Sequence, residues 1–329
     1  MALSNLTAAS SASIELFKQF PVEIGIESMI FQDCRQSGNV ALSNQIDIPL
    51  DAKGKQMINL DESSLNVRFR VEGENGAEVE PVKMALDRKT IEVNPTPVSI
   101  VNNPIHSIWE GVELSLNMQT VYTSRAHAFS QKNFLKILRS LEFSQVSKQA
   151  QLFHLDFPPH YVKNLAIRGG NQGVKERTQQ ILNKASVHVC GPLGLGIATT
   201  KTLLPPGVRG KLTLTRASDE YIILTDKEAE AKKFKFVIED VWVKLCLVTL
   251  PQPVYDGLMN TLTKIPAVYR YQETELKEIS YPANVRLPTI SEICTGLMPY
   301  EVVLALVTQN SHQGSRTTNP FAYEVRIIP

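Results

Sequence analysis

Residues 98–117, VSIVNNPIHSIWEGVELSLN, are the stretch that decides the fold class. The stretch begins with β-branched residues, passes a helix-like turn at Asn103-Pro104, and ends in residues 112–117, where apolar and polar side chains alternate. Alternation with a period of two is typical of a strand that buries one face. The same alternation recurs along the chain without a catalytic motif. The pattern therefore favours a large all-β scaffold.

Length and charge limit the function further. The chain has 329 residues, enough for one large β domain or two smaller ones, and 43% of the residues are hydrophobic. Lys and Arg number 34 against 33 Asp and Glu, which leaves a net charge of +1. So small a net charge provides no global field that would hold nucleic acid.

The cysteines and the N-terminus predict the cellular compartment. Cys34, Cys190, Cys246 and Cys294 are far apart and form no CxxC pair, so we expect no disulfide framework and a reducing compartment. Cys246 lies in an apolar run and should be a buried small hydrophobe.

The N-terminus lacks the basic start and apolar core of a signal peptide, and the longest apolar run, residues 241–250, is too short to span a bilayer. We expect a soluble, non-secreted chain. The sequon Asn5-Leu6-Thr7 is then a chance match.

Strand patterns occur in both halves of the chain. Residues 65–72 alternate most regularly and predict a half-buried antiparallel strand. Residues 234–250 form the longest β-rich run, and their apolar phase changes at Glu239-Asp240, which predicts a bulge. Helical spacing appears within residues 123–151 and 255–262. Further strands are expected at residues 22–31, 45–50, 185–190, 211–215, 221–224, 301–307 and 323–328.

Many strands spaced by turns, with few helices, favour an all-β sandwich or jelly roll, and two strand-rich halves favour two such domains in tandem. We expect a flexible arm at residues 1–13, an N-terminal barrel at residues 14–180 and a C-terminal barrel at residues 181–329. Residues 167–180 would link the halves. Outer loops are expected at residues 74–97, 167–180 and 225–233, because these segments are polar and rich in turn residues.

Two motifs suggest ligand chemistry and are interpreted structurally. Residues 191–196, GPLGLG, do not fit GxGxxG and carry no Walker lysine, so we interpret them as a strand-end turn. His154, Asp156 and His160 could in principle ligate a metal. They lie among Phe and Pro residues with no cysteine nearby, and we do not predict a metal site.

Other candidate residues also have a structural interpretation. His106 stands beside Ser107, but no Gly-x-Ser-x-Gly surrounds them, and we interpret the serine as a helix-start residue. Adjacent carboxylates cannot face each other across a sugar, so Asp61-Glu62, Asp219-Glu220 and Glu239-Asp240 do not indicate glycosidase chemistry; the last pair should be partly buried.

Arg68 and Arg70 share one face of a predicted strand, which we interpret as a solvated or subunit-facing surface because no aromatic residues are interleaved. Trp109 and Trp242 are expected to be core or interface anchors.

Segments along most of the chain resemble the major capsid (hexon-type) proteins of Polinton/Maverick elements and adintoviruses. The likeness lies in residues 13–17 with 26–28, in 60–71 (LDESSLNVRFRV), and in 101–117 followed by 122–126 and a helix. It continues in Gly191-Pro192, 203–216, 296–307 and 319–321. Residues 74–97 depart from the family pattern. The family pattern also continues with another strand-rich stretch after residues 319–321, where this chain soon ends.

The resemblance implies an all-β double jelly roll, two eight-stranded β-barrels in tandem with a few short helices in the connections. Its homotrimers would form pseudo-hexameric capsomers in an icosahedral shell around double-stranded DNA, so the protein would belong to the virion and assemble inside the host cell. Its partners would be copies of itself, neighbouring capsomers and penton or minor capsid proteins. It implies no enzymatic activity, no cofactor, no metal and no specific nucleic-acid binding. It leaves contact with an internal membrane open.

Three alternatives remain at this point. The first is a minor or penton capsid protein, which would need a single jelly roll. The second is a β-sandwich binding module of the lectin-like kind. The third is an enzyme on a β-scaffold such as a glycoside hydrolase.

Overall fold

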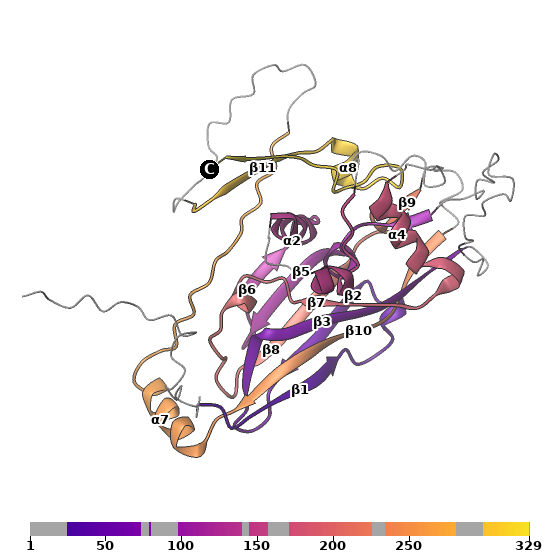
Figure 1. Cartoon of the computed structure of the whole chain (residues 1–329). Coiled ribbons are helices and arrows are strands. Elements are labelled where there is room, and N and C mark those ends of the chain that lie inside the picture. The colour runs from indigo at the N-terminus through magenta and orange to yellow at the C-terminus, as the bar shows by residue number, and fades with distance from the viewer. Residues whose placement is uncertain are drawn as a thin grey trace, which may run out of the picture.

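The barrel consists of eight antiparallel strands in two four-stranded sheets (Figure 1). The computed structural model describes residues 25–73, 79, 98–139, 145–156, 171–225, 234–280 and 299–328. One sheet has the order β1-β10-β3-β7 and the other has the order β2-β8-β5-β6. The strands are β1 (Ser28–Arg35), β2 (Gln45–Asp51), β3 (Met57–Gly73), β5 (Trp109–Leu116), β6 (Gln119–Ser124), β7 (Val187–Pro192), β8 (Arg209–Arg216) and β10 (Phe234–Thr249).

This strand order is that of a jelly roll. If the eight barrel strands are counted along the chain, the two sheets contain strands one, eight, three and six and strands two, seven, four and five. Consecutive strands therefore alternate between the sheets, apart from the hairpin of β5 and β6, and the first strand pairs with the last. The predicted all-β class with a few short helices is confirmed.

The longest strand, β3, confirms the pattern that predicted it. Leu65, Val67 and Phe69 on its inward face are at most 1% exposed, whereas Arg68 on the opposite face is exposed. On β10, the pairing with β3 shifts between Ile238 and Asp240, so the bulge predicted from the phase change is also confirmed. The extra residue lets the apolar side chains on both sides of the bulge face the same core.

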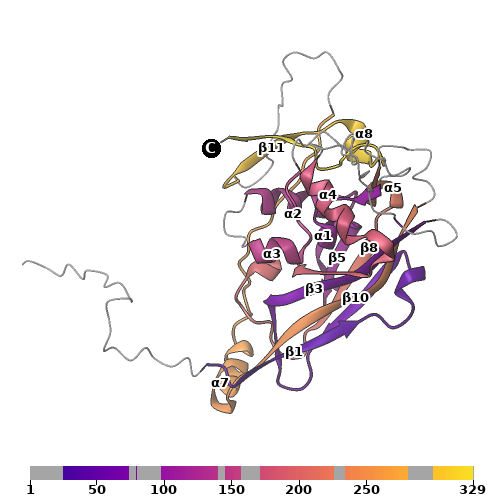
Figure 2. The same cartoon turned by 45° about the vertical axis from the view of Figure 1, so that its right-hand side comes forward.

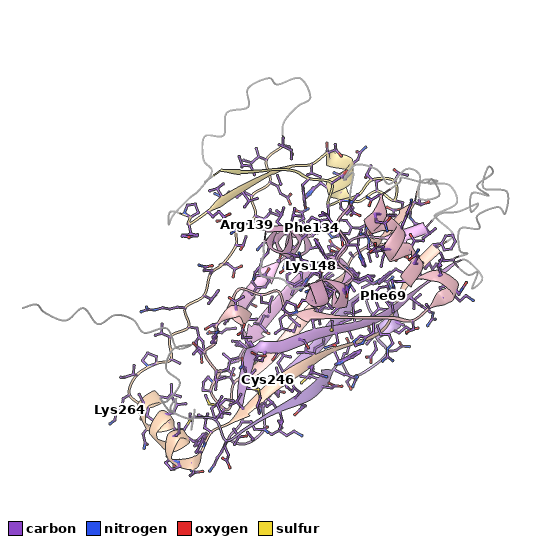
Figure 3. All side chains as sticks on the ribbon, in the orientation of Figure 1. Phe69, Phe134, Arg139, Lys148, Cys246 and Lys264 are labelled. Atoms are coloured by element: carbon purple, nitrogen blue, oxygen red, sulfur yellow. The ribbon has the colours of Figure 1, made fainter. Side chains whose placement is uncertain are left out.

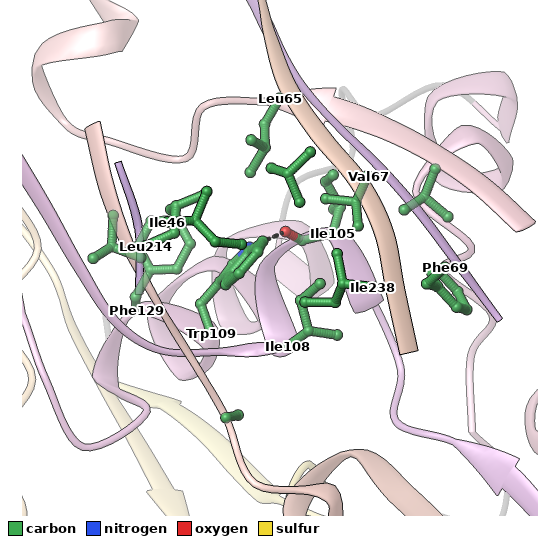
Figure 4. Close-up of a cluster of buried hydrophobic side chains, with 14 of the residues drawn as sticks. Ile46, Leu65, Val67, Phe69, Ile105, Ile108, Trp109, Phe129, Leu214 and Ile238 are labelled. Carbon is green, nitrogen blue, oxygen red and sulfur yellow. Dashed lines mark hydrogen bonds between the residues drawn. The ribbon is translucent and has the colours of Figure 1, made fainter. Parts of the chain in front are cut away.

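The core lies between the two sheets and continues under the helices. Trp109 is fully buried at the start of β5, and its indole N–H donates to the backbone oxygen of Ile105 over 2.9 Å (Figure 4). Side chains from both sheets surround it, among them Ile46, Leu214 and Ile238. Trp109 is thus the core anchor that the sequence predicted, and its one polar group is satisfied.

The connections differ between the two ends of the barrel (Figure 2). At the turn end, where β2, β5 and β10 end, β2 joins β3 and β5 joins β6 by short turns. At the loop end, where β3, β6 and β8 end, the chain makes long excursions before returning. These contain β4 (Val98–Ile100), α1 (Pro104–Ser107), α2 (Ala128–Arg139), α3 (Gln145–Ala150), α4 (Gln172–Gln180), α5 (Asp219–Ile222) and β9 (Ile223–Thr225). The helices predicted within residues 123–151 are confirmed as α2 and α3.

The predicted division of the chain at residues 180/181 lies inside this barrel. Strand β7 pairs with β3, β8 pairs with β2 and β5, and β10 pairs with β1 and β3. Residues 187–249 therefore complete the barrel that residues 28–124 begin, and that boundary is wrong. The chain forms a jelly roll by joining its first and last strands, so its two halves cannot fold as separate barrels.

The chain beyond β10 lies along the outside of the barrel. Helix α7 (Gln252–Leu262), predicted at residues 255–262, projects from the turn end, and residues 263–280 run from it towards the loop end without regular structure (Figure 1). There β11 (Val302–Leu306) pairs with β12 (Glu324–Ile328), and α8 (Gln309–Gln313) follows β11. A second eight-stranded barrel stays a prediction, and the arm at residues 1–13 lies outside the described residues.

Candidate assembly surfaces

The loop end gathers the flanks of the three predicted outer loops. Strand β4, which follows residues 74–97, pairs with β9 in the register Val98↔Thr225, immediately before residues 226–233. Helix α4 packs on β4, where the Ser99 hydroxyl donates to the backbone oxygen of Val174 over 3.0 Å. Residues 171–180 are this packed helix and its N-cap, so the prediction of a link between two halves is corrected there.

A buried ion pair holds the loop end together. Arg177 of α4 is fully buried, and its Nη2 lies 2.9 Å from Oδ1 of Asp156, whose side chain is 5% exposed. The same guanidinium donates to the backbone oxygens of Ile100 and His154 over 2.9 and 3.2 Å. Asn319 donates to the other Asp156 oxygen over 3.0 Å. One charge pair thus ties α4, β4 and the C-terminal segment together, with its hydrogen-bonding groups satisfied.

This cluster contains two of the three residues that the sequence analysis considered as metal ligands, His154 and Asp156. Both Asp156 oxygens accept hydrogen bonds from Arg177 and Asn319, and His154 Nδ1 lies 2.6 Å from a Glu176 oxygen. Burial lowers the pKa of His154, against the opposing charge of Glu176. His160 lies outside the described residues. Within the residues described here, no three His, Cys, Asp or Glu side chains gather as metal ligands.

Gly173 allows α4 to approach this segment. A Cβ at residue 173 would lie 2.7 Å from the backbone oxygen of Leu155 and 2.8 Å from the Asp156 carboxylate. Such contacts are closer than side-chain carbons tolerate, so any larger residue would push α4 away from Asp156. The glycine seen in the sequence therefore serves helix packing.

The C-terminal segment also docks at the loop end. Phe321 is 3% exposed and stacks on Phe134 of α2 with ring centroids 4.4 Å apart. Phe134 is labelled in Figure 3. The backbone N–H of Thr225 donates to the oxygen of Arg316 over 2.7 Å. The residues around α8 are therefore part of the packed body.

His106 and Ser107 do not form a catalytic pair. The Ser107 hydroxyl donates to the backbone oxygen of Asn102 over 2.7 Å, and Ser107 ends α1, so the helix-start interpretation is wrong. His106 Nδ1 lies 3.2 Å from the amide nitrogen of Asn103, and Nε2 lies 2.9 Å from the backbone oxygen of Pro192. Burial lowers the pKa of His106 to about 4. A neutral ring bound to these partners is a structural element, with no serine to activate.

Glu239 and the GPLGLG stretch at residues 191–196 also have structural roles. Glu239 accepts hydrogen bonds from Ser186 and from Arg70, the latter over 2.7 Å, and the Ser186 hydroxyl is the main reason that the pKa of Glu239 is lowered. Its side chain is 21% exposed, which confirms the predicted partial burial. The GPLGLG stretch ends β7, and Gly194 has a φ of +73°. The strand-end turn is confirmed.

On the outer face of the β1-β10-β3-β7 sheet, two arginine side chains lie over the ring of a tryptophan. Trp242 is 6% exposed, and the guanidinium carbons of Arg35 and Arg68 lie 4.9 and 5.8 Å from its ring centroid. His188 stacks on the same ring at 5.0 Å. Arg70 is paired with Glu72 and Glu239. The cations are thus bound to aromatic and acidic side chains, and a subunit-facing role for this face stays a prediction.

Strand β1 presents a second, apolar surface. It is an edge strand, and Met29, Ile30 and Phe31 are 44%, 47% and 54% exposed, with Ile26 at 41% just before it. Successive residues point to opposite faces of a strand, so both faces of this edge are apolar. Natural edge strands that remain in solvent are usually short or charged. We call Ile26, Met29, Ile30 and Phe31 the β1 patch.

The segment after α7 adds further exposed apolar side chains. Ile265, Val268 and Tyr271 are 61%, 69% and 41% exposed. The segment is held by a hydrogen bond from the Tyr269 hydroxyl to the backbone oxygen of Leu203 over 3.0 Å and by an ion pair of Glu273 with Lys132 at 3.9 Å. It is anchored at a few points and otherwise available for contact.

The cysteines in the described residues are unpaired, and the described helices are short. Cys34, Cys190 and Cys246 are free thiols, Cys246 is fully buried as predicted, and Cys294 lies outside the described residues. Burial raises the pKa of both Cys34 and Cys246, which keeps these thiols protonated. None of the helices in the described parts of the chain has the length and apolarity to cross a bilayer.

Comparison with known proteins gives likenesses in structure only. No protein-family model and no curated protein matches the sequence. The Faustovirus major capsid protein matches with a TM-score of 0.48 and 8% identity over 75% of this chain and 58% of that chain. A chain of the Sputnik virophage matches with a TM-score of 0.41 and 10% identity, over 76% of this chain and 53% of that one.

A chain of the PBCV-1 virus capsid matches with a TM-score of 0.38 and 13% identity over 73% of this chain and 46% of that chain. The present chain thus spans about half the length of the solved chains that it matches.

Proposed function

We propose that this protein is a structural capsid protein of an icosahedral double-stranded DNA virus, a non-enzymatic building block of the virion shell. The observation that carries the proposal is the eight-stranded jelly roll whose three longest connections between barrel strands, after β3, β6 and β8, leave from one end. A tile needs rigid walls, a decorated outer end and sides that contact copies of itself. The sequence resemblance to Polinton-type capsid proteins supports the same assignment.

The two ends of the barrel fit two different tasks. The loop end is tied together inside one chain by the Arg177–Asp156 pair, which suits a surface that projects outward. The β1 patch is left uncovered by the described residues of one chain, which suits a contact between copies. We propose that three copies associate into one capsomer, with neighbouring capsomers and penton or minor capsid proteins as further partners.

Light scattering coupled to size-exclusion chromatography tests the assignment. We expect the purified chain to elute as a trimer and to form shells or sheets of capsomers under negative stain at higher protein concentration. A monomer at every concentration would contradict the proposal. Glycan-array binding by such a monomer would favour the lectin-like alternative, and turnover of a glycoside would favour the enzyme.

A penton or other minor capsid protein is the second candidate. The described residues form a single jelly roll, and a vertex protein needs only one. A pentamer in native mass spectrometry would favour this candidate, whereas a trimer would favour the major capsid protein.

A further inference from the structure

Two exposed apolar surfaces lie at opposite edges of one sheet. The β1 patch belongs to β1, an edge strand of the β1-β10-β3-β7 sheet. The second surface is the segment 263–271, which we call the strap and which exposes Ile265, Val268 and Tyr271 by 61%, 69% and 41%. The strap lies on the connection that follows β7, the other edge strand of that sheet. Two different surfaces on two flanks are what a head-to-tail contact between copies requires.

The strap is held firmly at its edge of the sheet. The Tyr269 hydroxyl donates to the backbone oxygen of Leu203 over 3.0 Å. A Cβ at Gly196 would lie 2.7 Å from the backbone oxygen of Gln272 and 3.2 Å from the ring of Tyr271, so the strap lies directly on this glycine. A surface that is already ordered loses little conformational entropy when a partner binds it.

Both surfaces carry backbone groups that can pair with another chain. Within the described part of the chain, β1 pairs with β10 alone, so its second edge is open. Among the described residues, none of residues 266–272 makes a backbone–backbone hydrogen bond. Edge strands in soluble proteins are usually protected, and an extended segment can add to an open sheet edge as a further strand. The β1 edge and the strap are therefore suited to each other.

The charges of the two surfaces are complementary. Residues 26–34 contain Glu27 and Asp33 and no Lys or Arg. Residues 263–271 contain Lys264 and Arg270 and no Asp or Glu. Glu27, Lys264 and Arg270 are exposed, whereas Asp33 is shared with Arg35, its neighbour on the same strand. Opposite charges at the rim of an apolar contact orient the two partners and favour this pairing over a pairing of like surfaces.

We propose that β1 of one copy packs against the strap of the next copy, and that three such contacts close the ring of the trimer. The inference rests on the proposed trimer and adds to it the two surfaces that meet. A contact between two different surfaces generates a ring, whereas β1 against β1 of a second copy would give a two-fold dimer and leave the strap uncovered.

Photo-cross-linking in the trimer fraction tests the contact directly. A photoreactive amino acid at position 268 should label the peptide 26–35. If ¹⁴N and ¹⁵N protein are mixed as dilute monomers and then concentrated, the products should include mixed isotopes, because the label passes between chains. The same amino acid at position 118, in the exposed turn between β5 and β6, is the control and should label no β1 peptide. Labelling of other surfaces from position 268, or same-isotope products only, would overturn the inference.

Paired variants test the head-to-tail geometry. Phe31→Asp and Val268→Asp should each weaken trimer formation by roughly tenfold or more, because each places a charge in an apolar contact. Val254→Asp is the matched control at an exposed valine in the first turn of α7, and it should leave association unchanged. Urea denaturation of the dilute monomers should give the same stability for the two strap and β1 variants as for the unmodified chain, since both side chains are exposed.

Mixing the two variants distinguishes a head-to-tail contact from a symmetric one. The intact β1 of Val268→Asp meets the intact strap of Phe31→Asp, so native mass spectrometry of the mixture should show one-to-one heterodimers that neither variant forms alone. Homodimers of Val268→Asp would support β1 against β1 and overturn the inference. An unmodified chain that stays monomeric would contradict the trimer itself, whereas trimers that persist in Val268→Asp would contradict the strap contact alone.

Discussion

Helices α4 and α7 lie at opposite ends of the same barrel and differ in how many of their side chains the rest of the chain buries. Helix α4 buries Gly173, Val174 and the whole side chain of Arg177, and its neighbours accept each of the guanidinium hydrogen bonds described above. Helix α7 buries none of its residues. The difference teaches that the described residues complete the loop end within one chain, whereas at the turn end they leave Val254 of α7 45% exposed.

The largest expected effect comes from breaking the buried ion pair. Replacing Arg177 by Met leaves the Asp156 carboxylate buried without its cation, and we expect a loss of about 3–5 kcal/mol in the free energy of unfolding. Urea denaturation followed by tryptophan fluorescence measures this loss. Arg209→Met, at an exposed arginine, is the control and should change stability by about 0.5 kcal/mol or less. Equal losses of unfolding free energy in the two variants would show that the buried ion pair does not stabilise the loop end.

The second prediction concerns acid and the loop-end residue His106. The pKa of His106 is about 4 in the folded protein because of burial, whereas an unfolded histidine titrates near about 6.5. The unfolded state therefore binds the proton first, and stability falls as pH drops from about 6.5 to about 4 and then levels off. This one group contributes on the order of 3 kcal/mol over that window.

Comparing the variant His106→Gln with the original protein isolates this contribution. The difference in unfolding free energy between the two proteins should shrink by that amount between pH 7 and pH 4, because the variant has no proton to gain at residue 106. Parallel curves for the two proteins across this range would show that His106 titrates normally in the folded state.

A smaller effect is expected from the partly exposed pair on the sheet surface. The Arg70 side chain is 35% exposed and contacts Glu72 and Glu239 at 3.1 and 2.7 Å. Solvent screens such pairs, so Arg70→Met should cost about 0.5–1 kcal/mol, well below Arg177→Met. The cost should decline further in 0.5 M NaCl, measured by the same denaturation. A loss as large as that of Arg177→Met would show that depth of burial does not separate the two pairs.

The smallest effect on folding, with a large effect on association, is expected at the β1 patch. Phe31 is 54% exposed, so Phe31→Ser should change the free energy of unfolding of the monomer by about 0.5 kcal/mol or less. It should nevertheless shift the trimer towards monomer in light scattering, because the patch loses its largest side chain. Met118→Ser, at the fully exposed turn between β5 and β6, should leave association unchanged. Trimers that persist in Phe31→Ser would assign the contact to another surface.

Sequence patterns predicted individual strands well where one face of the strand is buried and the other is exposed to solvent. Residues 65–72 and the bulge at Glu239-Asp240 were predicted because alternation reports directly which side chains face the core. The ion pair at the loop end was missed. Asp156 was weighed as a metal ligand, and Arg177 sits in the polar sequence GVKERTQQ, where nothing distinguishes it from a surface residue. Only the packing of α4 on β4 removes it from water.

The sequence by itself determined the all-β class, the placement of most strands and helices, and the absence of a recognisable catalytic motif. Only the tertiary structure decided which strands pair, and with it that residues 28–249 form one barrel. The physical reason is that alternation specifies the face that a strand buries, whereas its partner is chosen by long-range packing and backbone hydrogen bonds. The first and last barrel strands, β1 and β10, are neighbours only in space.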